Sequence, residues 1–336
     1  MIKEAIEKLV EKEDLTYDMV NKCMEEIMSG ETDPVLISAY LTALRMKGET
    51  IDEISGSAMG MRNAGKKLDY NKDLLEIVGT GGDKSFSFNI STTSAIVVSA
   101  AGYPIAKHGN RGVSSKSGAA DVLEALGIKI DLEPEQAKEV LDKTNFCFLF
   151  AQKYHTSMKY VGPVRAKLGI RTIFNILGPL TNPAGANMNV IGVYDESLVK
   201  PIAQVLIKLG VKKGMVVYGQ DGMDEISASS KTTVCEFRNG EIKDYEIDPL
   251  QLGFDKHEKS ELVGGDAEEN AKITREVLDG KKGAKYDAVV LNAGACIYVA
   301  NDNLSYKEAI EIAKETIDSG KAKGQLQKII EVTQSF

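Results

Sequence analysis

The sequence lacks the features that mark several classes of protein. It contains no tryptophan, and its four cysteines, Cys23, Cys147, Cys235 and Cys296, are far apart and form no Cys-x-x-Cys pair. This spacing argues against a disulfide framework or a zinc site and favours free, buried thiols in a reducing cytoplasm. No apolar run approaches the ~20 residues that span a bilayer. The charged segment 1–8 is amphipathic and has no signal-peptide pattern. We therefore expect a cytoplasmic protein without a membrane partner.

Positive charge is also scarce. The chain has 41 Lys and Arg against 49 Asp and Glu, a formal net charge of −8. General nucleic-acid binding needs a basic surface, so we expect no nucleic-acid partner. The 336 residues are enough for about two domains of ~150 residues each.

A first glycine-rich turn, Gly79-Thr80-Gly81-Gly82-Asp83, follows the apolar run 74–78. Three glycines in four positions let the backbone turn its N–H groups toward one concavity. The segment Asn89-Ile90-Ser91-Thr92-Thr93 then opens an apolar helix, which we expect to begin with Ser91 as N-cap and to stop at Gly102. Free N–H groups, a helix dipole and hydroxyls at one helix start suit an anionic ligand.

A second turn of similar character follows the short apolar run 104–106. It reads Lys107-His108-Gly109-Asn110-Arg111-Gly112-Val113-Ser114-Ser115-Lys116-Ser117 and supplies three cations, a histidine, an amide and three hydroxyls. Taken singly, Gly-Gly pairs mark turns and charge clusters are solvated loops. Two such turns after two strands indicate a phosphate site. The P-loop motif is absent, and Lys84 breaks the dinucleotide pattern G-x-G-x-x-G, which disfavours nucleotide hydrolysis and dinucleotide binding.

The periodicity of apolar residues divides the chain in two. Residues 1–70 read as a small bundle of helices, with Asp33-Pro34 and the capping box Thr50 to Glu53 as helix starts. From residue 71 to 336, short β-rich runs alternate with helices, which predicts an α/β domain with a largely parallel sheet. The predicted strands are 74–78, 104–106, 146–150, 190–194 and 215–218. The tail from residue 266 reads as amphipathic helices. Ligands bind beyond the carboxyl ends of parallel strands, where both glycine turns lie.

A third polar loop, with Asp221, Asp224 and Glu225, follows the strand 215–218. Adjacent carboxylates at a strand end can hold a Mg²⁺ ion that takes its other ligands from water and substrate phosphates. An isolated Asp-Glu pair is more often a turn or a helix cap. The position after a strand favours a metal site.

Together these motifs resemble the anthranilate phosphoribosyltransferases, which belong to the nucleoside-phosphorylase-like class of phosphoribosyltransferases. The resemblance covers almost the whole chain and depends on six motifs that occur in the same order. They are the turn 79–83, Asn89-Ile90-Ser91-Thr92, Lys107-His108-Gly109-Asn110-Arg111, Val164-Arg165 with Gly169-Ile170-Arg171-Thr172, Asn175-Ile176-Leu177-Gly178-Pro179-Leu180-Thr181-Asn182-Pro183, and Asp221-Gly222-Met223-Asp224-Glu225.

The resemblance implies transfer of the phosphoribosyl group from 5-phospho-α-D-ribose 1-diphosphate (PRPP) to the amino group of anthranilate. This step belongs to tryptophan biosynthesis and yields N-(5-phosphoribosyl)anthranilate and diphosphate. It further implies two Mg²⁺ ions per active site, a cytoplasmic homodimer formed through the helical domain, and residues of about 160–185 joined to that domain.

The resemblance also implies roles for individual residues. Ser91, Asp224 and Glu225 would bind Mg²⁺. Anthranilate would contact Gly79, His108, Asn110 and Arg165, since a guanidinium pairs with a carboxylate bidentately. We expect His108 to contact substrate rather than to act as an obligatory base, and His155 to lie near the acceptor entrance. The residues that would bind PRPP are Gly79, Gly82, Asp83, Ser87, Asn89, Ile90, Ser91, Thr92, Lys107, His108, Gly109, Asn110, Arg111, Gly112, Val113, Ser114, Ser115 and Ala119.

Two positions depart from the pattern of the family. Ser87 stands where Thr is expected and keeps the hydroxyl, whereas Ala119 stands where Ser is expected and removes one phosphate contact.

Two other functions compete with this one. A pyrimidine nucleoside phosphorylase would share the architecture, but Asn110, Arg165 and the Asp224-Glu225 pair argue against it. A non-catalytic nucleic-acid-binding relative would need a broad basic groove and degraded motifs, and this chain is acidic with intact motifs.

Overall fold

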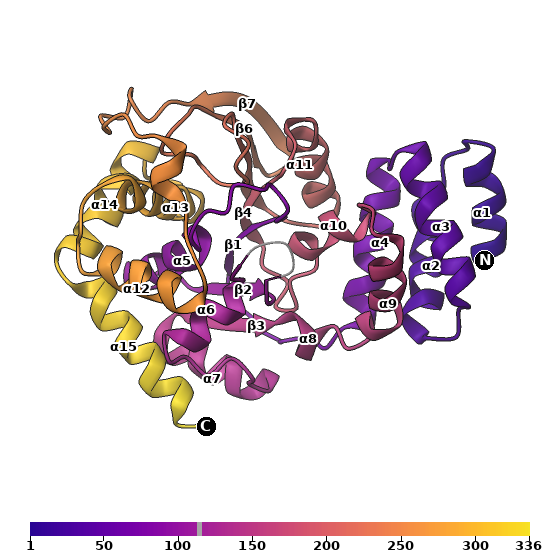
Figure 1. Ribbon diagram of the computed structural model, residues 1–336, viewed down its shortest axis with the longest axis horizontal. Helices are drawn as coiled ribbons and strands as arrows, with labels where there is room; N and C mark the ends of the chain where they lie inside the picture. Colours follow the sequence, from indigo (N-terminus) through magenta and orange to yellow (C-terminus); the bar gives the residue numbers. More distant parts are fainter. Residues whose placement is uncertain (113–115) are drawn as a thin grey trace.

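The computed structural model describes residues 1–112 and 116–336, and it joins a bundle of helices to a larger α/β unit (Figure 1). The N-terminal helices are α1 (Ile2–Val10), α2 (Tyr17–Ser29), α3 (Pro34–Lys47) and α4 (Ile51–Ala64). Asp33 caps α3 by accepting a 2.7 Å hydrogen bond from the amide of Val35, and Thr50 forms a capping box with Glu53 at the start of α4. Both predicted helix starts are confirmed.

A later segment packs on this bundle. Helix α9 (Met158–Leu168) comes after three strands of the sheet, yet it lies against α2 and α3. Its buried Val161 and Val164 share an apolar cluster with the N-terminal helices. Figure 1 shows α9 beside the indigo helices, and α10 (Phe174–Leu177) leads the chain back toward the sheet.

The α/β unit is built on one seven-stranded sheet in the order β3-β2-β1-β4-β5-β6-β7. The first five strands along the chain are parallel, and β6 and β7 are antiparallel at one edge. The predicted α/β class with a largely parallel sheet is confirmed. The strands are β1 (Leu75–Gly79), β2 (Ile105–Gly109), β3 (Phe146–Phe150), β4 (Met188–Gly192), β5 (Lys213–Gly219), β6 (Thr232–Arg238) and β7 (Glu241–Ile247).

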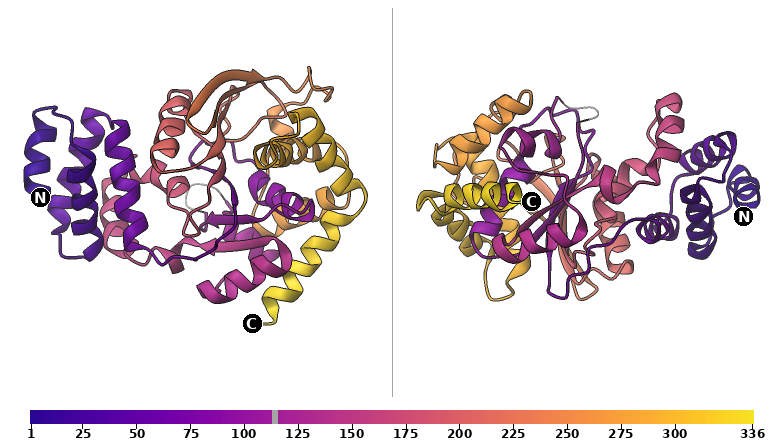
Figure 2. Two further views of the ribbon diagram at one scale, coloured as in Figure 1. Left: turned by 180° about the vertical axis from the view of Figure 1, so that it is seen from behind. Right: turned by 90° about the horizontal axis from the view of Figure 1, so that it is seen from below.

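Helices cover both faces of this sheet, because alternate side chains of each strand point to opposite sides. On β4, Val190 joins one apolar cluster and Ile191 joins another. Figure 2 shows the sheet between the two layers. Helix α11 (Val199–Lys208) packs on the face nearer the bundle, α7 (Pro134–Thr144) packs on β3, and α8 (Ala151–Tyr154) follows β3. The other face carries α5 (Ile90–Ala100), α6 (Ala119–Ala125), α12 (Ala267–Leu278), α13 (Ala284–Ala300), α14 (Tyr306–Asp318) and α15 (Lys321–Gln334).

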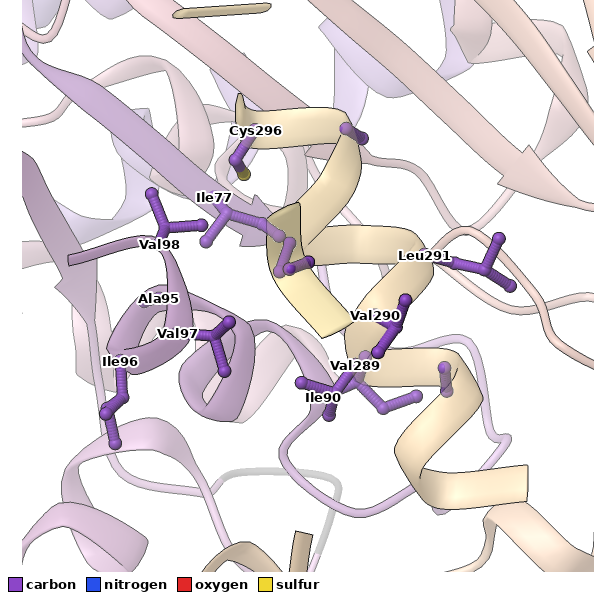
Figure 3. Packing of buried hydrophobic residues seen from close by; sticks show 14 of the residues in the cluster. Ile77, Ile90, Ala95, Ile96, Val97, Val98, Val289, Val290, Leu291 and Cys296 are labelled. Atoms are coloured by element: carbon purple, nitrogen blue, oxygen red, sulfur yellow. The ribbon is translucent and has the colours of Figure 1, made fainter. Parts of the chain in front are cut away.

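The helices α5 and α13 form the centre of the larger core (Figure 3). Val97 and Val98 of α5 and Val289 and Val290 of α13 are buried beside Ile77 of β1. The prediction that the tail contains amphipathic helices is confirmed by α12, α14 and α15, whereas α13 is buried on nearly all sides. The reason is its position between the sheet, α5 and α14. Within the described residues, no helix is long and apolar enough to cross a membrane.

Candidate active site

The carboxyl ends of β1, β2, β4 and β5 bring the candidate residues together. The first glycine turn leaves β1, and Gly81 and Gly82 take φ values of 71° and 74°, which glycine adopts without strain. The amide of Gly81 donates a 2.6 Å hydrogen bond to Oδ2 of Asp224, which lies in the loop after β5. The first turn and the acidic loop are therefore in direct contact.

Two glycines make room for Asp224. A Cβ atom on Gly79 would lie 2.3 Å from Oδ2 of Asp224, and one on Gly192 would lie 1.7 Å from its carbonyl oxygen. A side chain at position 79 would displace the carboxylate of Asp224, and one at position 192 would displace the backbone of the acidic loop. Gly192 ends β4 and is absent from the residues expected from sequence. The predicted strand 190–194 placed this glycine in its middle, so no signal in the sequence indicated that Gly192 ends a strand at the site.

Asp224 and Glu225 are buried carboxylates next to each other and to Asp83. Burial raises the pKa of Asp224 to about 7, with a further rise from the charge of Asp83. Burial also raises the pKa of Glu225 to about 8, and the charge of Asp224 adds to this effect. Such groups favour a bound cation, which would compensate the cost of ionising them.

Ser91 joins this acidic pair. Its amide donates a 3.3 Å hydrogen bond to Oε1 of Glu225, and its hydroxyl accepts one of 3.1 Å from Nζ of Lys107. In residues 1–112 and 116–336, no three His, Cys, Asp or Glu side chains are grouped as metal ligands. Two carboxylates and a hydroxyl fit a Mg²⁺ ion that completes its shell with water and substrate oxygens.

The start of α5 differs from the expectation. Asn89 is the N-cap and Ser91 lies inside the first turn, so the prediction of Ser91 as N-cap is wrong. The Asn89 side chain reaches across the site, where its Nδ2 donates to the carbonyl of Ser117 at 3.4 Å and its Oδ1 accepts from Nδ2 of Asn270 at 3.0 Å. The Ser91 hydroxyl is instead bound by Lys107. Ile90 and Thr92 are buried in the same turn, and Ser87 forms an isolated bridge with Val263.

The second glycine turn begins later than expected, because β2 extends to Gly109. Lys107 and His108 therefore lie in a strand and are buried. Nζ of Lys107 donates to the carbonyl of Ile77 at 2.8 Å as well as to Ser91. Burial lowers the pKa of Lys107, and the neighbouring charge of Glu225 opposes this effect. The ammonium group thus lies between the two turns.

His108 packs edge-on against His155, with ring centroids 5.0 Å apart. Its Nδ1 lies 3.3 Å from the carbonyl oxygen of Gly178. Burial, with a smaller effect of His155, lowers the pKa of His108 to about 3. A neutral, weakly basic imidazole at this place supports contact with substrate more than general-base catalysis.

The rest of the described second turn is bound to α6 by ion pairs and hydrogen bonds. Arg111 pairs with Asp121 at 3.0 Å and with Glu124 at 2.5 Å, so its charge is already engaged. The amide of Gly112 also donates to Asp121, at 2.8 Å. Oδ1 of Asn110 accepts from the amide of Arg111 at 2.8 Å. Ala119 is the first residue of α6, and the expected phosphate contacts of Val113, Ser114 and Ser115 lie outside the described residues.

The two arginines of the segment 165–171 differ in their contacts, since in the part of the chain that the structure describes only Arg171 contacts a residue of the glycine turns. Arg165 on α9 is half-buried with its guanidinium 5.5 Å from the ring centre of Phe174. No carboxylate of residues 1–112 or 116–336 forms an ion pair with it. Arg171 donates from Nη2 to the carbonyl of Gly82 at 2.7 Å and stacks on Tyr194 at 4.0 Å. Arg171 was part of the recognised motif, but no role was expected for it.

Comparisons with known proteins agree with this geometry. Residues 3–65 match the helical bundle domain, and residues 71–323 the a/b domain, of a glycosyl transferase family. Anthranilate phosphoribosyltransferase of Lachnoclostridium phytofermentans is 61% identical over 99% of both chains, and that of Methanobrevibacter smithii is 59% identical over 100% of both.

Solved structures give the same result. The enzyme of Thermus thermophilus has a TM-score of 0.93 at 41% identity and covers 98% of this chain and 99% of its own. The Saccharomyces cerevisiae enzyme in complex with PRPP and Mg has a TM-score of 0.91 at 30% identity, over 100% of this chain and 98% of its own. The chain belongs to the anthranilate phosphoribosyltransferase family.

Proposed function

We propose that this enzyme transfers the 5-phosphoribosyl group of PRPP to the amino group of anthranilate, in tryptophan biosynthesis. The products are N-(5-phosphoribosyl)anthranilate and diphosphate. The observation that carries the proposal is the contact of the first glycine turn and Ser91 with the buried pair Asp224 and Glu225. A yeast relative has been solved with PRPP and Mg, and again with 4-fluoroanthranilate.

In this proposal, Ser91, Asp224 and Glu225 hold Mg²⁺, with two ions in each active site. Their support is the raised pKa of both carboxylates and the hydrogen bond between Ser91 and Glu225. The bound ions would neutralise charge on the diphosphate. The rest of the PRPP site comprises Gly79, Gly82, Asp83, Ser87, Asn89, Ile90, Thr92, Lys107, His108, Gly109, Asn110, Arg111, Gly112, Val113, Ser114, Ser115 and Ala119.

Anthranilate is assigned to Gly79, His108, Asn110 and Arg165. Arg165 has no carboxylate partner among the described residues, and burial lowers its pKa. A carboxylate that binds a desolvated guanidinium through two hydrogen bonds stabilises its charge strongly, and anthranilate has such a carboxylate.

The reaction does not require a strong base. As the bond from ribose C1 to diphosphate breaks, positive charge develops on the sugar, and the anthranilate amine attacks C1. The protein contributes by holding donor and acceptor in place and by binding the leaving diphosphate, which are positional and electrostatic effects. The weakly basic His108 is consistent with such a reaction.

The decisive experiment follows anthranilate fluorescence after addition of PRPP, with and without Mg²⁺. Magnesium-dependent loss is expected. Thymidine or uridine with phosphate is tested in parallel, and nucleoside cleavage without loss of anthranilate would show a nucleoside phosphorylase instead. Arg165→Ala should raise the KM for anthranilate far more than that for PRPP. Equal increases would contradict the role of Arg165.

We further propose a cytoplasmic homodimer that forms through the helical domain, with a domain boundary near residue 70 and residues of about 160–185 on the helical side. Three apolar side chains of the bundle support the interface: Val10, Val35 and Met46 are 65%, 74% and 82% exposed. Light scattering on the purified protein should give twice the 36.4 kDa chain mass. A monomer at micromolar concentration would contradict the interface.

A further inference from the structure

The ladder between β1 and β2 stops after its first residue pair. These strands are paired only at Leu75 and Ile105, whereas five residue pairs join β1 to β4 and five join β2 to β3. The amide of Leu75 donates to the carbonyl of Pro104 at 3.0 Å. In a regular parallel ladder, the next bonds would join Ile77 to residues 106 and 108 of β2.

Side chains take the place of these bonds. The amide of His108 donates to Oε1 of Glu76 at 3.1 Å, and the carbonyl of Ile77 accepts from Nζ of Lys107 at 2.8 Å. The carbonyl of Ala106 accepts from Nδ2 of Asn182 at 2.8 Å. The two strands that lead into the glycine turns are thus connected by side chains over the stretch where their backbones no longer pair.

Glu76 is the acidic member of this group and has no role in the reaction as described above. It is the second residue of β1 and has no exposed surface, and Lys107 in the same gap is 1% exposed. Burial raises the pKa of Glu76, and Asn182 and the charge of Lys107 oppose the rise. A buried carboxylate needs such partners, so its position is closely determined.

We propose that Glu76 is a positioning residue of the transferase: by binding the amide of His108 from within the β1–β2 gap, it sets the spacing of the two glycine turns and hence the fit of PRPP. The inference rests on the proposed function. It concerns the donor substrate more than the acceptor. Most residues of the two turns are assigned to PRPP alone, whereas Gly79, His108 and Asn110 are assigned to both substrates.

The test compares Glu76→Leu, which removes the acceptor at similar volume, with Glu76→Gln, which keeps a carbonyl oxygen of similar reach. Glu76→Leu should raise the KM for PRPP by roughly 10- to 100-fold, as expected when the buried amide of His108 is left without an acceptor. The KM for anthranilate should rise less than that for PRPP, because Arg165, which is assigned to anthranilate alone, lies on α9 outside the two turns. Glu76→Gln should restore most of the PRPP affinity.

Thr144→Val is the matched control. Thr144 is 1% exposed, and its hydroxyl donates to the carbonyls of Val140 and Phe146 before β3, away from the glycine turns. This variant should lower thermal stability and leave both KM values unchanged. If Glu76→Leu behaves in the same way, Glu76 is structural and the inference is overturned.

Two further outcomes are distinguishable. Equal losses in Glu76→Gln and Glu76→Leu would overturn the inference, because the charge and not the bond to β2 would then matter. If Glu76→Leu does not fold, the KM of Glu76→Gln decides, and a rise matching the range above would overturn the inference in the same way. The wild-type enzyme is assayed first, and its failure to consume anthranilate with PRPP would refute the proposed function instead.

Discussion

Replacing Gly192 by alanine places a methyl group where the acidic loop now lies. The new Cβ would be 1.7 Å from the carbonyl oxygen and 2.2 Å from the carbonyl carbon of Asp224, and both are backbone atoms. Since real Cβ contacts are not below 3.0 Å, the loop must move by more than about 1 Å. Overpacking of this kind costs about 1–3 kcal/mol in the free energy of unfolding.

The catalytic effect should exceed the effect on stability. A displacement of about 1 Å at a reacting site can cost about 100-fold, so we expect kcat/KM for PRPP in Gly192→Ala to fall by roughly that factor. The midpoint of Mg²⁺ activation should rise, because Asp224 moves away from its place beside Glu225. Steady-state anthranilate fluorescence, measured over a Mg²⁺ series, gives both quantities.

Gly324→Ala is the control for this experiment. Gly324 lies within α15, and a Cβ there would meet nothing within 4 Å. Alanine should raise the free energy of unfolding by about 0.5–1 kcal/mol without changing activity. Wild-type kcat/KM and Mg²⁺ dependence in Gly192→Ala would refute the reasoning, since the loop would then tolerate the methyl group.

Three other perturbations test the acidic pair, Arg171 and a helix cap. The pKa values of Asp224 and Glu225 are raised in the folded protein, so the folded protein retains protons that the unfolded chain releases. Without Mg²⁺, the contribution of these two groups to the free energy of unfolding should therefore be greatest below about pH 4 and should fall as the pH rises to about 8. Melting curves at several pH values should show this loss, and Asp224→Asn with Glu225→Gln should reduce it, leaving the share that comes from Glu76. Arg171→Leu removes the bond to Gly82 and should raise the KM for PRPP by about 10-fold, with titration calorimetry of PRPP as the check. Thr50→Ala should lower the free energy of unfolding by about 1 kcal/mol in denaturant titrations and leave kcat unchanged.

The success of the predictions depends on how local their signals are. The helix start at Asp33 and Pro34 was predicted correctly, because a cap and a proline act within one turn. The hairpin of β6 and β7 was missed, although Asn239 and Gly240 at its turn, with φ values of 49° and 87°, are a local signal. The acidic loop that precedes this hairpin was interpreted as part of the site, and no strand was predicted after it.

Nonlocal contacts explain the errors near the site. Ser91 is as good an N-cap as Asn89 by type, but its hydroxyl is bound by Lys107, sixteen residues later in the chain. Lys107 and His108 look like residues of a polar turn, yet pairing with β3 keeps them in the sheet and buries them. Neither outcome can be obtained from the local sequence, because both depend on which strands become neighbours.

The sequence by itself determined the family, the α/β class and the glycine-rich and acidic motifs, because residue types and their spacing carry this information along the chain. Only the tertiary structure decided that Asp224 sits against Gly79 and Gly192, that Glu76 substitutes for a ladder bond, and that Arg171 reaches Gly82. These contacts join residues far apart in the chain. Their distances depend on strand order and packing, which no local pattern encodes.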